Sequence, residues 1–97
     1  MKRKLKVTDT ENKLIRHLPP RLKNKIRKAL DEILEDPNAG KYLVEDLEGM
    51  RSYKIGRFRI VYRVEEASII VISIGPRKSI YENIALEMKR YLENPNG

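Results

Sequence analysis

Three stretches between residues 51 and 74, separated by short turns, limit the fold more than any other feature of this sequence. Residues 51–55 and 58–64 place their side chains on two faces with a period of two, which is the pattern of half-buried strands. Residues 68–74 are almost continuously apolar, as expected of a strand covered on both faces. Gly56-Arg57 and residues 65–67 supply the turns. The sequence therefore predicts three strands connected by hairpins.

Two helices and a short strand are expected before these hairpins. Residues 2–7 suit a first strand. Thr8 to Glu11 then has the capping-box pattern, with a hydroxyl at the N-cap and a carboxylate three residues later. The first helix must end before Pro19-Pro20, because the residue before a proline is pushed out of helical geometry. Proline is favoured at the first position of a helix, so a second helix is expected from residue 20 to about residue 36, where Asp36-Pro37 ends it.

A last helix is expected after the strands, because residues 79–82 form another plausible capping box. The predicted order is strand, helix, helix, strand, strand, strand, helix. Helices segregated from a hairpin-connected sheet indicate the α+β class. We therefore expect one domain over residues 1–97. It should contain a small twisted antiparallel sheet of about four strands, two N-terminal helices packed on one face, and a C-terminal helix.

Composition narrows the cellular context and the chemistry. The 97 residues include no cysteine and one histidine, so disulfides and a recognisable set of metal ligands are not expected, and neither is a cofactor. The histidine, His17, is expected to pack or cap at the end of the first helix. No apolar stretch follows the basic N-terminus and none approaches the ~20 residues of a membrane span. We expect a cytoplasmic protein.

The charge distribution is uneven and mainly positive. Lys and Arg number 21 and Asp and Glu number 14, a net charge of +7. Residues 1–30 carry 11 basic and 2 acidic side chains, residues 31–50 carry 1 and 7, and residues 51–97 carry 9 and 5. Such basic blocks suit polyanions such as nucleic acid, or an acidic protein partner. The alternative is a highly charged surface of the kind found in heat-adapted proteins.

The second helix carries much of this positive charge in its first half. Its cations are Arg21, Lys23, Lys25, Arg27 and Lys28. Positive charge near a helix N-terminus opposes the helix dipole, which indicates a binding role more than a stabilising one. Lys23 and Arg27 are therefore candidate RNA-binding residues. The alternative is that these cations only form the solvent-exposed face of the helix and bind nothing.

The strand at 58–64 predicts a second basic surface. If its aromatic and aliphatic face, including Tyr62, packs on the helices, Arg59 and Arg63 point the other way. Lys54 is expected on the same outward face of the neighbouring strand. Arg77 follows the last strand directly. Basic residues that alternate on a strand are often only its wet face, and that alternative stays open.

Lys78 and Tyr81 complete this candidate set, close to Arg77 in sequence. The set suits an RNA phosphodiester. Cleavage by the ribose 2′-hydroxyl needs a proton acceptor, cations that hold the charge on phosphorus, and a proton for the leaving oxygen. Arginine binds phosphate in a bidentate manner, a lysine crowded by other cations can accept a proton, and a tyrosine ring can stack on an unpaired base.

Two segments resemble the RelE/ParE family of toxins. Leu47-Glu48-Gly49 followed by Tyr53-Lys54-Ile55-Gly56-Arg57-Phe58-Arg59-Ile60-Val61-Tyr62 resembles the family pattern L-x-G … Y-R-[IL]-x-x-G-x-[YF]-R-[IV]-[IV]-Y. Ile74-Gly75-Pro76-Arg77-Lys78-Ser79-Ile80-Tyr81 resembles its closing [VI]-G-x-R-x-x-x-Y. The resemblance covers about residues 2–90. Ser52 stands where many RelE-like members have a basic residue.

The resemblance implies a toxin of a type II toxin–antitoxin system that cleaves messenger RNA on the ribosome without a metal. By this resemblance Arg59 and Arg77 would stabilise the phosphate and transition state, Lys54 would act as base or clamp, and Tyr81 would stack on or orient the RNA. Arg63, Lys78, Lys23 and Arg27, which the charge pattern alone indicates, are expected to add contacts to RNA.

The resemblance also implies a cognate antitoxin as partner, with operator DNA bound only through the toxin–antitoxin complex. Two other functions stay open. One is inhibition of DNA gyrase, as in the ParE branch, without nuclease activity. The other is a catalytically inert relative that binds an antitoxin.

Overall fold

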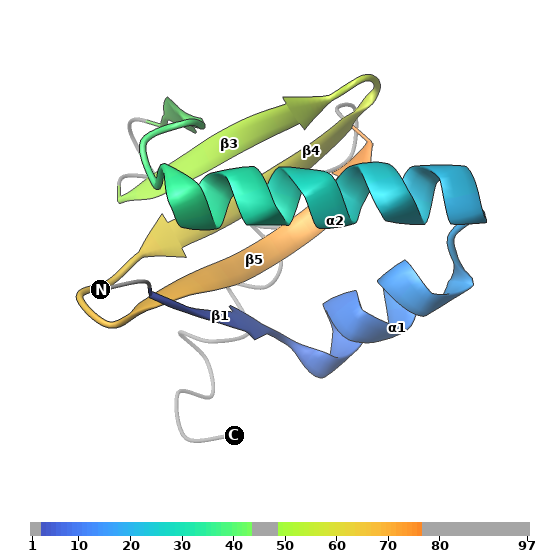
Figure 1. The fold of residues 1–97 in the computed structure, drawn as a ribbon, viewed down its shortest axis with the longest axis horizontal. Coiled ribbons are helices and arrows are strands. Elements are labelled where there is room, and N and C mark those ends of the chain that lie inside the picture. Colours follow the sequence, from blue (N-terminus) through green and yellow to red (C-terminus); the bar gives the residue numbers. More distant parts are fainter. Residues whose placement is uncertain (1–2, 44–48, 77–97) are drawn as a thin grey trace, which may run out of the picture.

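A five-stranded sheet with two helices on one face makes up residues 3–43 and 49–76, the part of the chain that the computed structural model describes (Figure 1). The elements are β1 (Lys4–Val7), α1 (Asp9–His17), α2 (Pro20–Glu35), β2 (Lys41–Tyr42), β3 (Met50–Ile55), β4 (Phe58–Val64) and β5 (Ser68–Pro76). The expected α+β class is confirmed. The expected C-terminal helix lies outside the described residues.

The sheet has the strand order β1-β5-β4-β3-β2. Strands β3, β4 and β5 pair antiparallel in sequence order, as the period-two pattern predicts. The prediction of about four antiparallel strands needs two corrections. β1 pairs with β5 in parallel, which makes the sheet mixed, and β2 adds a two-residue strand beside β3. Two residues are too few to show a periodic pattern, so the sequence gives no signal for β2.

The β3–β4 hairpin is as tight as the sequence indicates. Ile55 is paired with Phe58, which leaves only Gly56-Arg57 in the turn. Gly56 has a φ of 56°, in the left-handed region that glycine adopts without steric cost. This turn fixes the register of both strands, and therefore decides which residues of β3 and β4 share a face.

The ends of the helices follow the predicted caps. The Thr8 hydroxyl accepts a hydrogen bond from the Glu11 amide at 3.3 Å, and α1 ends at His17, directly before the Leu18-Pro19 step. The Glu11 carboxylate accepts a hydrogen bond from the Ile74 amide in β5 at 3.1 Å. β1 pairs with β5 only as far as Val71. Glu11 therefore serves an amide beyond the end of β1, and the carboxylate links α1 to the sheet.

The main core lies between the helices and one face of the sheet (Figure 1). Its fully or nearly fully buried members are Ile26, Ala29, Leu30, Ile33, Ile60, Tyr62, Ile69, Val71 and Ile74. The prediction that Tyr62 belongs to the core is confirmed. No helix among the described residues is long and apolar enough to cross a membrane.

A smaller apolar cluster lies on the other face of the sheet. Met50 and Val61 are buried there, with Leu43 and Ile72 packed against them. A β-bulge opposite Val61 and Tyr62 adds one residue to β5. Ile72 thereby joins this cluster while Val71 and Ile74 stay in the main core. The apolar run of β5 is buried on both faces, as its composition predicts.

Candidate functional site

Lys54 and Arg59 lie directly opposite each other on β3 and β4. Their neighbours Tyr53 and Ile60 are also a pair, and these belong to the helix-facing core. The two cations therefore lie on the sheet face that points away from α1 and α2, as the alternation predicts. Lys54 is exposed and Arg59 is half-buried.

This pair of like charges has no acidic partner among the residues that the structure describes. Like charges directly opposite each other on neighbouring strands are destabilising. The nearby turn adds Arg57, a third cation, which is exposed. The hairpin end of this sheet face is therefore a positively charged position where a bound anion would relieve the repulsion.

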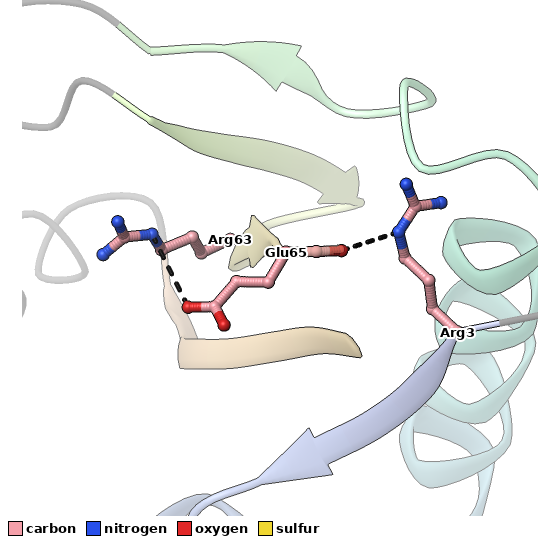
Figure 2. A network of polar contacts seen from close by, with 3 residues as sticks. All are labelled: Arg3, Arg63 and Glu65. Atoms are coloured by element: carbon pink, nitrogen blue, oxygen red, sulfur yellow. Dashed lines mark hydrogen bonds and ion pairs between the residues drawn. The ribbon is translucent and has the colours of Figure 1, made fainter. Parts of the chain in front are cut away.

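Arg63 has a different environment from Lys54 and Arg59, although it lies on the same face. Its Nε atom is 4.0 Å from Oε1 of Glu65, and the two side chains are 58% and 48% exposed (Figure 2). Arg3 donates from its Nε to the backbone carbonyl of Glu65 at 2.7 Å (Figure 2). An exposed ion pair of this length contributes little to stability. It nevertheless partly neutralises Arg63, whose role in RNA binding stays a prediction.

Strand β2 brings a further cation to this face that sequence reasoning missed. Lys41 is paired with Ser52, which is paired with Val61, so all three lie on the face of Lys54 and Arg59. Lys41 is exposed. Its place depends on a two-residue strand that gives no sequence signal.

The centre of the face is apolar and buried, which sequence reasoning also missed. Val61 is fully buried and Met50 is 7% exposed, and the neighbouring Ser52 and Ser73 are also buried. The signal was present, because Val61 is apolar at an outward position between Arg59 and Arg63. The cations thus lie around an apolar centre.

The helical candidates lie on the other side of the sheet. Arg27 is exposed on α2, and Lys23 is half-buried, with its ammonium donating to the Arg16 carbonyl at 3.2 Å. The structure therefore does not bring Lys23 and Arg27 together with Lys54 and Arg59. His17 is exposed in the last turn of α1, where a positive charge would suit the helix dipole.

The remaining candidates, Arg77, Lys78 and Tyr81, lie outside the described residues, and their roles stay predictions. Strand β5 leads to them, because Gly75 and Pro76 are paired with Arg59 and Phe58. Within residues 3–43 and 49–76, no group of three or more His, Asp or Glu side chains is arranged to hold a metal ion.

Comparison with known families agrees with this arrangement. Residues 7–81 match the model of the ParE toxin of type II toxin–antitoxin systems. The chain belongs to this RelE/ParE toxin family. The match includes the segment of two helices and three hairpin-connected strands, and it covers well over half of the 97 residues. Among curated protein sequences, none matches the chain.

Solved structures of RelE proteins have the same fold as this family member. A free-state structure of E. coli toxin RelE, in an arginine-to-alanine double mutant, has a TM-score of 0.73 at 24% identity, covering 93% of this chain and 98% of that one. The toxin–antitoxin complex RelBE2 of Mycobacterium tuberculosis has a TM-score of 0.69 at 23% identity, covering 79% of this chain and 100% of that one. The RelB–RelE complex of Methanococcus jannaschii has a TM-score of 0.60 at 20% identity, covering 79% of this chain and 95% of that one.

Proposed function

We propose that this toxin is a metal-independent endoribonuclease that cuts messenger RNA held in the ribosome and so inhibits translation in the cytoplasm. The observation that carries the proposal is the Lys54–Arg59 pair. Two cations opposite each other on neighbouring strands repel, and a phosphate between them converts that repulsion into attraction. Family membership and the RelE fold support the same function.

The reaction requires only groups that the chain itself contains. The 2′-oxygen attacks the adjacent phosphorus while its proton passes to a base, for which Lys54 is the candidate. The bond from phosphorus to the 5′-oxygen breaks, and that oxygen takes up a proton from solvent while the base holds the proton released by the 2′-hydroxyl. The products are a 2′,3′-cyclic phosphate and a 5′-hydroxyl. Arg59 would hold the phosphate oxygens and stabilise the extra charge in the transition state.

Three residues that follow β5, together with Arg63 in β4, complete the proposal. Arg77 would be the second cation on the transition state, and Tyr81 would stack on or orient a base. Lys78 and Arg63 would contact the RNA backbone. These assignments come from the sequence pattern, so the test has to include Arg77 besides Arg59.

The test is cleavage of messenger RNA in a translating extract, mapped by primer extension. Arg59→Ala and Arg77→Ala should each reduce cleavage by about 10²- to 10³-fold, the scale for loss of one transition-state donor. Arg57→Ala is the matched control, because it removes an equal charge from the adjacent turn and should retain most of the activity. Equal losses in all three variants would indicate a general charge effect and would contradict the assigned roles.

Inhibition of DNA gyrase is the second candidate function, and the family model favours it because that model is the one for ParE toxin. A gyrase inhibitor would need no preorganised phosphate site. Intact messenger RNA in the extract, together with inhibition of purified gyrase in a supercoiling assay, would establish this function and exclude the ribonuclease.

We also propose a cognate antitoxin as partner, since similar solved structures are of RelB–RelE complexes. Operator DNA would be bound only through that complex. Co-expression with the product of a neighbouring small gene should restore growth and yield a stable complex during purification.

A further inference from the structure

A second set of cations lies on the helical layer, away from Lys54 and Arg59. Between Glu11 and Asp31 the sequence has seven Lys and Arg and no acidic residue. Three of these cations, Arg21, Lys25 and Lys28, are exposed and follow one another at spacings of four and three residues on α2. Residues at these spacings lie on the same side of a helix. We call them the α2 row.

The α2 row lies on the flank of the helix that faces β3. Glu32 continues the row by one further turn, and its carboxylate accepts a hydrogen bond from the Tyr53 hydroxyl in β3. The N-terminal half of α2 lies at the end of the molecule where the β3–β4 hairpin turns (Figure 1). The row therefore borders the hairpin that carries Lys54 and Arg59 on its other face.

Folding does not account for the charge of this row. The first turn of α2 contains no acidic residue and the last turn contains no basic one, which is the reverse of what the helix dipole favours. In the part of the chain that the structure describes, Arg21, Lys25 and Lys28 form no ion pair. Their positive charge is thus directed to solvent, where it can act on a partner.

We infer that the α2 row binds the phosphate backbone of double-stranded RNA. The row spans about 10 Å of helix, long enough to contact more than one phosphate of a strand. Backbone contacts of this kind need cations and carry no sequence information. The inference rests on the proposed RNA ligand but not on cleavage, because the row lies on a different face from the Lys54–Arg59 pair.

Two other polyanionic partners fit the row less well. Single-stranded nucleic acid is normally held by aromatic side chains together with cations, and the row contains no aromatic residue. An acidic protein would need apolar anchors at the centre of its interface. The exposed large hydrophobic side chain among the described residues is Tyr42, in β2, beyond the opposite end of α2.

The experiment measures binding of a fluorescent 16-base-pair RNA duplex to the full chain by anisotropy at several salt concentrations. The triple variant R21Q/K25Q/K28Q should bind at least about 10-fold more weakly at 0.1 M salt, and its slope of log K against log salt should fall by about 3. The matched control is K4Q/K6Q/K13Q, which removes the same charge from exposed positions on β1 and α1. The control should lose less than about 3-fold.

Each other outcome would overturn the inference. Equal losses in the two triple variants would indicate attraction by net charge alone. Equal or tighter binding of an unpaired 16-nucleotide uridine strand would assign the row to single strands. Displacement of the duplex by an acidic peptide, but not by heparin, would assign it to a protein.

A separate variant distinguishes this inference from the proposed cleavage. K54Q/R59Q should lose cleavage and retain duplex binding within about 3-fold. Thermal unfolding is the control for correct folding of the triple variant. R21Q/K25Q/K28Q should have an equal or higher Tm, because the charges that oppose the helix dipole are removed. A lower Tm together with lost binding would contradict the view that the row serves binding and not the fold.

Discussion

The side chain of Tyr62 links the core to the connection between α2 and β2. It is fully buried in the core, yet its hydroxyl donates to the Pro37 carbonyl and accepts from the Gly40 amide, both at 2.8 Å. Tyr62→Phe removes both hydrogen bonds and leaves two backbone groups without that partner. We expect a loss of about 1–3 kcal/mol in the free energy of unfolding, measured by urea denaturation.

The control for this variant is Tyr42→Phe. The Tyr42 hydroxyl accepts from the exposed Gly49 amide at 3.2 Å, where water can take its place. Its loss should change the free energy of unfolding by less than about 0.5 kcal/mol. Similar losses in the two variants would mean that burial does not increase the contribution of the Tyr62 hydroxyl to the free energy of unfolding.

The same hydroxyl gives a prediction about pH. Burial raises the pKa of Tyr62 above its ordinary value of 10.0, an effect opposed by the Gly40 hydrogen bond and by Arg51. The unfolded chain therefore releases this proton first. The contribution of the protonated Tyr62 hydroxyl to the free energy of unfolding is complete below about pH 10. It is lost as the pH rises through the pKa of Tyr62 in the folded state.

The measurement is the free energy of unfolding between pH 8 and pH 11 for wild type and Tyr62→Phe. Every other ionisable side chain is common to the two proteins, so the difference between the two curves isolates Tyr62. We expect the advantage of wild type to shrink above pH 10. An advantage that grows with pH would show that the pKa is lowered by folding.

The α2–β2 connection depends on close approach of its backbone to β3 and β4. A Cβ atom added at Gly40 would lie 2.7 Å from the Tyr62 hydroxyl oxygen and 3.1 Å from a backbone carbon of Ser52. Gly40→Ala therefore has to displace the Tyr62 ring or the strand. We expect a destabilisation of about 1–3 kcal/mol by urea denaturation.

A double-mutant cycle with Tyr62→Phe tests that mechanism. Removing the hydroxyl relieves one contact, but the ring carbon Cε1, at 2.8 Å, remains. The two changes should therefore be less than additive, with part of the Gly40→Ala effect retained in the Phe background. Full additivity would place the strain elsewhere in the connection.

Elements with a long periodic pattern were predicted from the sequence, and elements defined by distant partners were not. β4 was expected at 58–64 and lies at Phe58–Val64, because seven alternating residues specify a strand and its buried face. β2 has only two residues and exists through its pairing with β3. The parallel direction of β1 depends on β5, more than 60 residues later, and no local pattern contains that information.

The residues of the candidate site also divide into those placed by a local pattern and those placed by distant contacts. Alternation alone placed Lys54 and Arg59 on the outward face, since a strand leaves only two choices for each side chain. Lys41 was missed because it depends on β2. The separation of Arg27 from that face follows from the same alternation, because the helices were expected on the face opposite Lys54 and Arg59.

For the molecule as a whole, excess positive charge predicts how stability responds to salt. The net charge is +7, and the ion pair between Arg63 and Glu65 is long and exposed. Screening should therefore remove more repulsion than attraction, both between Lys54 and Arg59 and along α2. We expect Tm to rise by a few degrees between about 0.02 and 0.3 M sodium chloride, a range over which the Debye length falls severalfold.

The variant K54Q/R59Q identifies the source of this response. It removes the repelling pair, so its Tm at low salt should exceed that of wild type and its rise with salt should be smaller. K4Q/K6Q removes the same charge from the β1 edge, where the two lysines are on alternate residues of one strand, and should change the response less. A Tm that falls with salt in wild type would mean that attractive pairs dominate. In that case repulsion on the outward sheet face would no longer support a phosphate site there.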